Sequence, residues 1–179
     1  VYRAAGGTAL PGLVQETLGL HRSEQEPLLL SVARAGVEIF CLGETVAVPL
    51  FKVLRDGCTQ PAARRALDRI LRDEVRHRDF GWTLLEWLSE LPVREQVIGL
   101  VQGELPRMFA RLRRSYGSVG NAQRKAVPAE DRVWGLMAPA RYAEILERTI
   151  EKDYVPLFMT CGIDARAAWA ASATVPAAG

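Results

Sequence analysis

The sequence predicts an all-α protein, and three observations favour this class. Apolar side chains recur at spacings of three and four residues along four long segments, as they do on one face of a helix. The strict apolar–polar alternation that is typical of strands is nowhere sustained. Proline, glycine and capping residues stand between the segments, where helices begin and end. A chain of 179 residues has the size of one domain, so we predict a single domain over residues 1–179.

The first predicted helix follows a glycine-rich lead-in over residues 1–22, which we expect to be irregular. Ser23 and Glu26 have the spacing of a capping box, in which a serine and a glutamate three residues later satisfy free backbone amides at a helix start. The apolar periodicity then continues to about Arg55, with a break expected near Gly36.

Three further helices are expected after a turn at residues 56–60. The second helix should begin at Pro61, because proline suits the first turn of a helix, where its missing N–H costs nothing. The alanine-rich tail from Ala165 is expected to have marginal structure. Glycine, proline and serine place the three helices at about 61–88, 92–114 and 140–161, with a long connection over 115–139.

Composition and charge exclude several classes of protein. The 23 basic and 21 acidic residues give a net charge of +2, which is too small for a nucleic-acid-binding surface. No apolar run approaches the ~18 residues that a membrane span requires. Cys41, Cys58 and Cys161 lack the spacing of a zinc ribbon or a disulfide framework, which favours free thiols and a cytoplasmic location. The chain begins at Val1, and an N-terminal leader that has been removed is an open alternative.

Each predicted helix places an acidic residue in the middle of its apolar face, at about 100° of rotation per residue. Glu38 lies outside this face on the first helix and serves as a contrast. On the second helix, His77 follows the central acid by three residues and shares its face. The four central acids are Glu44, Glu74, Glu104 and Glu147.

Four acids in the interior of one domain call for a counter-ion. A buried carboxylate without a partner costs several kcal/mol, so it must be paired, protonated or bound to a metal. Glu44, Glu74 and Glu104 lie at similar distances from the ends of their helices and could meet at one level. Carboxylates of this kind together with a Glu-x-x-His pair form the ligand set of a dinuclear iron or manganese centre.

The acid Glu44, the segment Glu74-Val-Arg-His77 and the acid Glu104 resemble the ferritin-like superfamily over residues 23–162. The resemblance implies a four-helix bundle with two iron or manganese ions and either O₂ or peroxide chemistry or iron storage. It also implies that Glu44, Glu74 and His77 hold one metal, with Glu74 able to bridge. Glu104 and an acid of the fourth helix would hold the second metal.

The fourth helix departs from the family's usual pattern. Ile150 stands three residues after Glu147, where the family usually carries a second histidine. Glu151 is the alternative ligand, because Val-Pro-Leu-Phe follows it at the same distance as it follows Glu44. The geometry of the apolar face favours Glu147, and Glu144 is a third choice nearer the edge of that face.

Two functions therefore stay open at this stage. The four central acids favour an oxidase or oxygenase with a dinuclear centre that activates O₂ or peroxide. The missing histidine favours a non-catalytic protein that binds or stores iron, or a degenerate bundle with one metal or none.

Arg107 and Arg111 lean toward the inner face of the third helix and could pair with the acids in place of a metal. A further departure from the family's pattern is the position of the long connection, which lies between helices three and four. A homodimer is an open possibility for the assembly.

Overall fold

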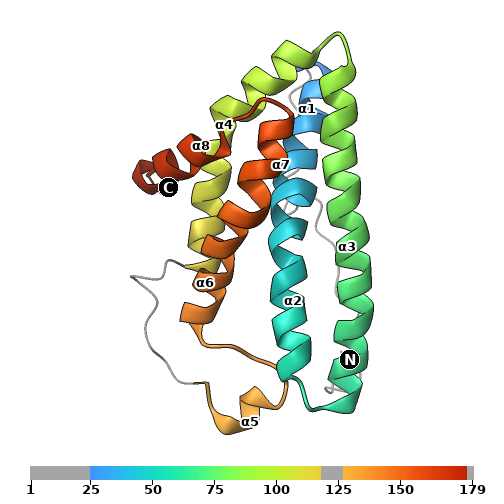
Figure 1. Cartoon of the computed structure of the whole chain (residues 1–179), viewed down its shortest axis with the longest axis vertical. Coiled ribbons are helices and arrows are strands. Elements are labelled where there is room, and N and C mark those ends of the chain that lie inside the picture. The colour runs from blue at the N-terminus through green and yellow to red at the C-terminus, as the bar shows by residue number, and fades with distance from the viewer. Residues whose placement is uncertain (1–24, 118–126, 177–179) are drawn as a thin grey trace.

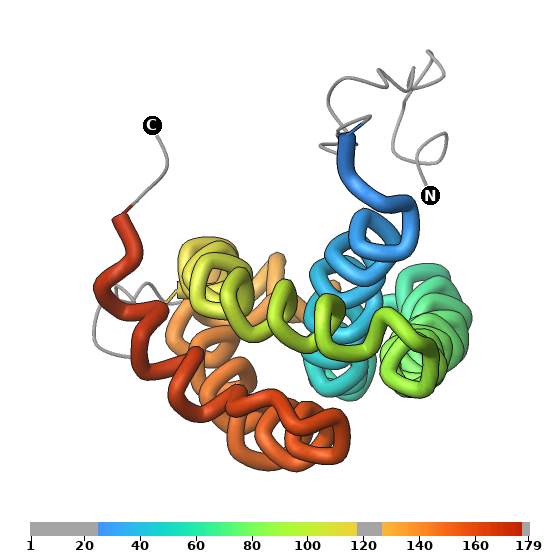
Figure 2. Tube along the Cα trace, turned by 90° about the horizontal axis from the view of Figure 1, so that it is seen from above, coloured from blue at the N-terminus to red at the C-terminus, as the bar shows by residue number. Residues whose placement is uncertain are grey.

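The computed structural model describes residues 25–117 and 127–176. These residues form helices and no strand, apart from an isolated bridge between Cys58 and Trp134, which confirms the all-α class. Figure 1 shows long helical segments that run alongside one another. In Figure 2, helix α4 (Arg94–Tyr116) crosses over the segment that begins with α1 (Leu28–Ala35) and ends with α2 (Thr45–Gly57). Within the described ranges, every helix is too short or too polar to cross a membrane.

The first long segment is continuous but contains a π-helix. The predicted break near Gly36 is the point where α-helical pairing changes to the wider π-helical pairing. The helix starts after Pro27, whereas Ser23 of the predicted capping box and the lead-in over residues 1–22 lie outside the described residues. The three parts are α1 (Leu28–Ala35), η2 (Gly36–Glu44) and α2 (Thr45–Gly57).

The second and third long segments lie close to their predicted positions. Pro61 is the first residue of its helix, as its fixed φ angle favours. Each helix extends two residues beyond its predicted end, since helical backbone hydrogen bonding does not stop where the apolar pattern stops. The helices are α3 (Pro61–Glu90) and α4 (Arg94–Tyr116).

The described part of the long connection contains a short helix, α5 (Ala129–Arg132), and packs against the turn between α2 and α3. The backbone amides of Thr59 and Gln60 both donate to the carbonyl of Val133, at 2.9 and 3.2 Å. This contact ties the start of α3 to the chain that leads into the fourth long segment.

The fourth long segment also changes its pairing along its length. A second π-helix interrupts it after Thr149, so residues 150–154 follow a different rotation from the rest. Its parts are α6 (Pro139–Thr149), η3 (Ile150–Tyr154) and α7 (Val155–Thr160).

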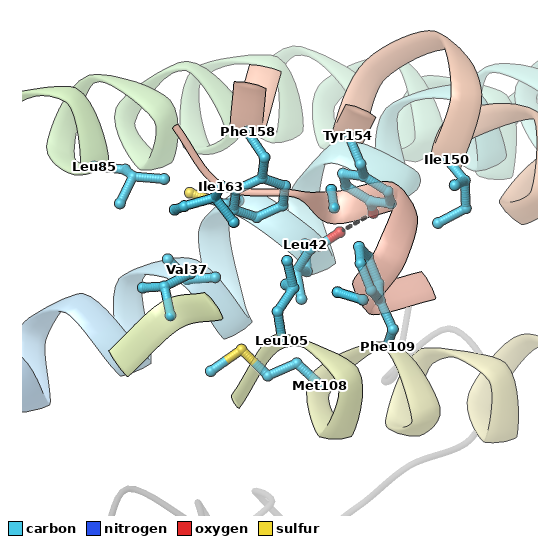
Figure 3. Close-up of a cluster of buried hydrophobic side chains, with 14 of the residues drawn as sticks. Val37, Leu42, Leu85, Leu105, Met108, Phe109, Ile150, Tyr154, Phe158 and Ile163 are labelled. Atoms are coloured by element: carbon cyan, nitrogen blue, oxygen red, sulfur yellow. Dashed lines mark hydrogen bonds between the residues drawn. The ribbon is translucent and has the colours of Figure 1, made fainter. Parts of the chain in front are cut away.

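The core lies where η2, α3, α4, η3 and α7 meet, as Figure 3 shows. Aromatic rings fill its centre: Phe109 lies 5.7 Å from Tyr154 and 6.5 Å from Phe158, and Trp82 meets Phe158 edge-on at 4.9 Å. Such pairs add to the free energy of burying apolar area. The largest fully buried side chains are Tyr154, Phe109, Phe158, Leu42, Leu85, Leu88, Leu105, Met108, Leu146, Ile150, Ile163 and Val37.

The alanine-rich tail is ordered, which the sequence did not predict. It forms α8 (Ala165–Ala171) and the short 3₁₀ helix η4 (Ser172–Thr174) against α4. The ring of Trp169 packs 5.4 Å from that of Phe109, and the guanidinium of Arg113 lies 3.4 Å above the Trp169 ring centre. Arg113 also donates to the hydroxyl of Ser172 at 2.8 Å. One arginine of α4 therefore holds the tail in place.

Replacing Arg113 with alanine should release α8 and lower the free energy of unfolding by about 2 kcal/mol, because it removes a cation–π contact and hydrogen bonds to a charged group. Urea unfolding measures the loss, and amide hydrogen exchange should show it first in residues 165–174. Arg114, the exposed neighbour, makes no ion pair or hydrogen bond within the described residues, so Arg114→Ala is the control. Equal losses in both variants would contradict the role given to Arg113.

Candidate metal centre

Three polar side chains converge between the end of η2 and the middle of α3. Glu44, Glu74 and His77 each offer one ligand atom, and these atoms all lie within 4.8 Å of one another. The Nδ1 atom of His77 lies 3.4 Å from Oε2 of Glu74 and 3.9 Å from Oε1 of Glu44. We call this group the Glu44 site. The structure thus brings together the three residues that the resemblance assigns to one metal.

The position of the Glu44 site follows from local helix geometry and one close helix contact. Glu74 and His77 are neighbours on one face because they are three residues apart on α3. One turn further on, η2 packs directly on the α3 backbone at Gly81. A Cβ atom on Gly81 would lie 2.6 Å from the Phe40 Cβ and 2.8 Å from the backbone nitrogen of Cys41. Only a glycine permits this approach, which brings Glu44 to the α3 residues.

The two carboxylates are largely buried and the imidazole forms the outer wall of the site. The side chains of Glu74 and Glu44 are 15% and 21% exposed, whereas that of His77 is 50% exposed. The Oε2 atom of Glu74 is buried and has no hydrogen-bond partner among the described residues. A buried carboxylate oxygen without a donor is costly unless a proton or a cation compensates for it. The donor set fits a divalent cation that accepts oxygen and imidazole ligands.

The charges of the site interact strongly. Burial raises the pKa of Glu44 to about 8, and the neighbouring carboxylate of Glu74 acts in the same direction. The same charges act on Tyr116 at the C-terminal end of α4: burial raises the pKa of Tyr116, and the charges of Glu44 and Glu74 raise it further. At neutral pH the metal-free pair therefore retains a proton, which a bound cation would displace.

The metal-free protein should lose stability as the pH rises from 6 to 8. The pKa of Glu44 is raised in the folded state from its ordinary 4.5 to about 8, so its contribution is fully favourable below 4.5 and disappears as the pH passes 8. Urea unfolding in the presence of a chelator measures this trend. Glu44→Gln cannot titrate at this position and should flatten the decline. An equal decline in this variant would mean that another group causes it.

The other predicted ligands lie outside the Glu44 site, and each faces an arginine. Glu104 binds the guanidinium of Arg34 on α1 through two contacts, at 2.8 and 2.9 Å. The side chain of Glu147 is 42% exposed and lies 3.7 Å from Arg113. Neither Glu104 nor Glu147 belongs to the group of described ligand atoms that lie within 4.8 Å of one another.

The π-helix η3 accounts for the position of Glu151. A π-helix closes its hydrogen bonds over five residues, so residues 150–154 do not follow the rotation of 100° per residue used for an α-helix. Ile150 and Tyr154 turn inward and are buried, whereas Glu151 points outward and binds Arg166 at 2.6 and 2.7 Å. Glu144 likewise pairs with Arg141 on the surface, at 2.8 Å.

Sequence reasoning missed two features of this region. Glu44 is the last residue of the π-helix η2, and π-helical turns occur frequently at functional sites. Tyr116 lies on the helix that was expected to contribute Glu104, and the charges of Glu44 and Glu74 help to raise its pKa. No local residue pattern distinguishes either feature from an ordinary α-helix.

Comparisons of the chain with family models, with curated proteins and with solved structures give no match. A function for this chain therefore has to be inferred from the side chains of the Glu44 site.

Proposed function

We propose that this chain is a ferritin-like metal-binding protein that holds one divalent metal ion between Glu44, Glu74 and His77. The observation that carries the proposal is the convergence of three ligand atoms within 4.8 Å, with the buried Oε2 of Glu74 lacking a hydrogen-bond donor among the described residues. Two carboxylates and an imidazole suit iron or manganese. The ferritin-like bundle is supported by the four long helical segments and by the placement of Glu44 on the first and Glu74-x-x-His77 on the second.

One ion is favoured over two because the remaining acids have other partners. Arginine side chains neutralise Glu104 and Glu151, and Glu147 lies near Arg113 at a more exposed position. A guanidinium remains charged at every pH that the protein meets, so it is a permanent substitute for a second metal. This supports the iron-binding or degenerate alternative over a dinuclear oxidase.

Redox chemistry with O₂ or peroxide is the second candidate, and the exposure of His77 favours it. With half of its side chain exposed, His77 lies at the solvent side of the site. Three protein ligands do not fill the coordination shell of iron or manganese, so a small molecule could reach a bound ion from that side.

Metal binding by purified metal-free protein tests the proposal. Anaerobic titration with Fe²⁺, and separately with Mn²⁺, should show one ion per chain. Glu74→Gln and His77→Ala should each weaken binding by about 100-fold or more, because a direct ligand is lost and even the loss of a group that only supports a ligand costs 10- to 100-fold. Glu38→Gln is the matched control and should bind as the unmodified protein does, since Glu38 lies outside the site and pairs with Arg111.

Two outcomes would contradict a single-metal site. No binding in the unmodified protein would refute the metal-binding function. Two ions per chain, with one lost in Glu104→Gln, would favour the dinuclear enzyme over the single site. Consumption of O₂ by the iron-loaded protein would separate the redox candidate from simple binding.

A further inference from the structure

A buried tyrosine of η3 reaches into the backbone of the helix that carries Glu44. The Tyr154 hydroxyl donates to the carbonyl of Leu42 at 2.5 Å, as the dashed line in Figure 3 shows. Tyr154 is fully buried, so its hydroxyl depends on a partner inside the protein. The tyrosine hydroxyl therefore binds a carbonyl of the same helix turn that carries Glu44.

This contact lies at the junction where π-helical pairing ends. Glu44 is the last residue of η2, and Leu42 lies two residues before it. The amide of Thr45 also bonds to the Leu42 carbonyl, which tightens the turn. A side chain that bonds to the backbone of a helix is a recognised cause of a local change in helix direction. The direction of the Glu44 side chain depends on this turn.

A second contact, from another helix, holds the same turn. The indole Nε1 of Trp82 donates to the hydroxyl of Thr45 at 2.9 Å. Trp82 belongs to α3, the helix that carries Glu74 and His77. The turn is thus fixed both to η3 and to the helix that supplies the other two ligands.

We infer that Tyr154 is a positioning residue for Glu44: its hydroxyl holds the turn over residues 42–46 and so directs the Glu44 carboxylate toward Glu74 and His77. This inference rests on the proposed metal-binding function. Without the hydroxyl, the Leu42 carbonyl loses its bond to η3, and the turn that carries Glu44 can change its direction.

The test is Tyr154→Phe, which keeps the aromatic contact with Phe109 and removes only the hydroxyl. Cobalt(II) is the probe, because the visible absorption of the bound ion reports its coordination. Affinity for Co²⁺ should fall about tenfold or more, as happens when support for a metal ligand is lost, and the spectrum should change. Tyr142→Phe is the control, since the Tyr142 hydroxyl makes no hydrogen bond within the described residues. Circular dichroism should show equal helix content in both variants.

Unchanged affinity and an unchanged spectrum in Tyr154→Phe would overturn the inference. If the unmodified protein binds no Co²⁺, the proposed function fails, and a crystal structure of metal-free Tyr154→Phe decides the positioning role. A Glu44 carboxylate displaced from Glu74 supports that role even then, whereas a carboxylate in the same place refutes it.

Discussion

Gly81→Ala should disrupt the Glu44 site and destabilise the protein by about 2 kcal/mol. The added methyl group would lie 2.6 Å from the Phe40 Cβ and 2.8 Å from the backbone of Cys41, so η2 would have to move away from α3. Glu44 stands three residues beyond Cys41 and would be carried away from Glu74. Urea unfolding measures the loss of stability, and Fe²⁺ titration should show weakened binding in the folded variant.

Gly103→Ala provides the matched control in another helix. Apart from the neighbouring backbone of α4 itself, no atom of the described residues lies within 4 Å of the Cβ position at Gly103, and the residue is exposed. Alanine favours the helix by about 0.5–1 kcal/mol over glycine, so this variant should be slightly more stable and should bind metal normally. A stable Gly81→Ala variant with normal binding would show that η2 and α3 can separate without consequence for the site.

Metal binding should produce the second large effect, a stabilisation that grows with pH. At a free metal concentration of about 100 times Kd, one site stabilises the native state by about 2.7 kcal/mol. The pKa of Glu44 is about 8 in the metal-free protein, so protons compete with the metal below that pH. The difference in melting temperature between metal-saturated and chelated protein should therefore be larger at pH 8 than at pH 5.

His77→Ala should remove most of this difference at both pH values, because it removes the imidazole ligand. Glu151→Gln is the control, since Glu151 pairs with Arg166 on the surface. A difference that is equal at pH 5 and pH 8 would mean that the metal does not displace a proton from the carboxylate pair.

The helices and the pairing of Glu74 with His77 could be predicted because local geometry determines them. Apolar periodicity with proline and glycine at the boundaries depends only on neighbouring residues, so the segment beginning at Pro61 was placed correctly. Glu74 and His77 share a face because they are three residues apart on an α-helix. The resemblance to the ferritin-like superfamily, and not local geometry, assigned Glu44 to the same metal as Glu74 and His77.

The partners of the remaining predicted ligands depend on tertiary contacts, which local sequence patterns do not indicate. Arg34 lies 70 positions before Glu104 in sequence, and nothing in the helical pattern of either helix indicates their pairing. Residues 150–154 were assigned the rotation of an α-helix, whereas η3 turns Glu151 outward. The tail likewise depends on Arg113 and Trp169, a contact between two separate helices. Charge pairing and π-helical turns therefore account for most of the differences between the predicted and the observed structure.

Arg34 binds Glu26 and Glu104 together, and on the proposed metal-binding function this has a consequence for the protein in a cell whose metal supply varies. A guanidinium cannot be chelated away, so the pairing of α1 with α4 persists in a metal-starved cell. The pairing of η2 with α3 around Glu44 and Glu74 has no such permanent charge among the described residues. Starvation should therefore loosen η2 first, and proteases should cleave there while the Arg34 end remains folded.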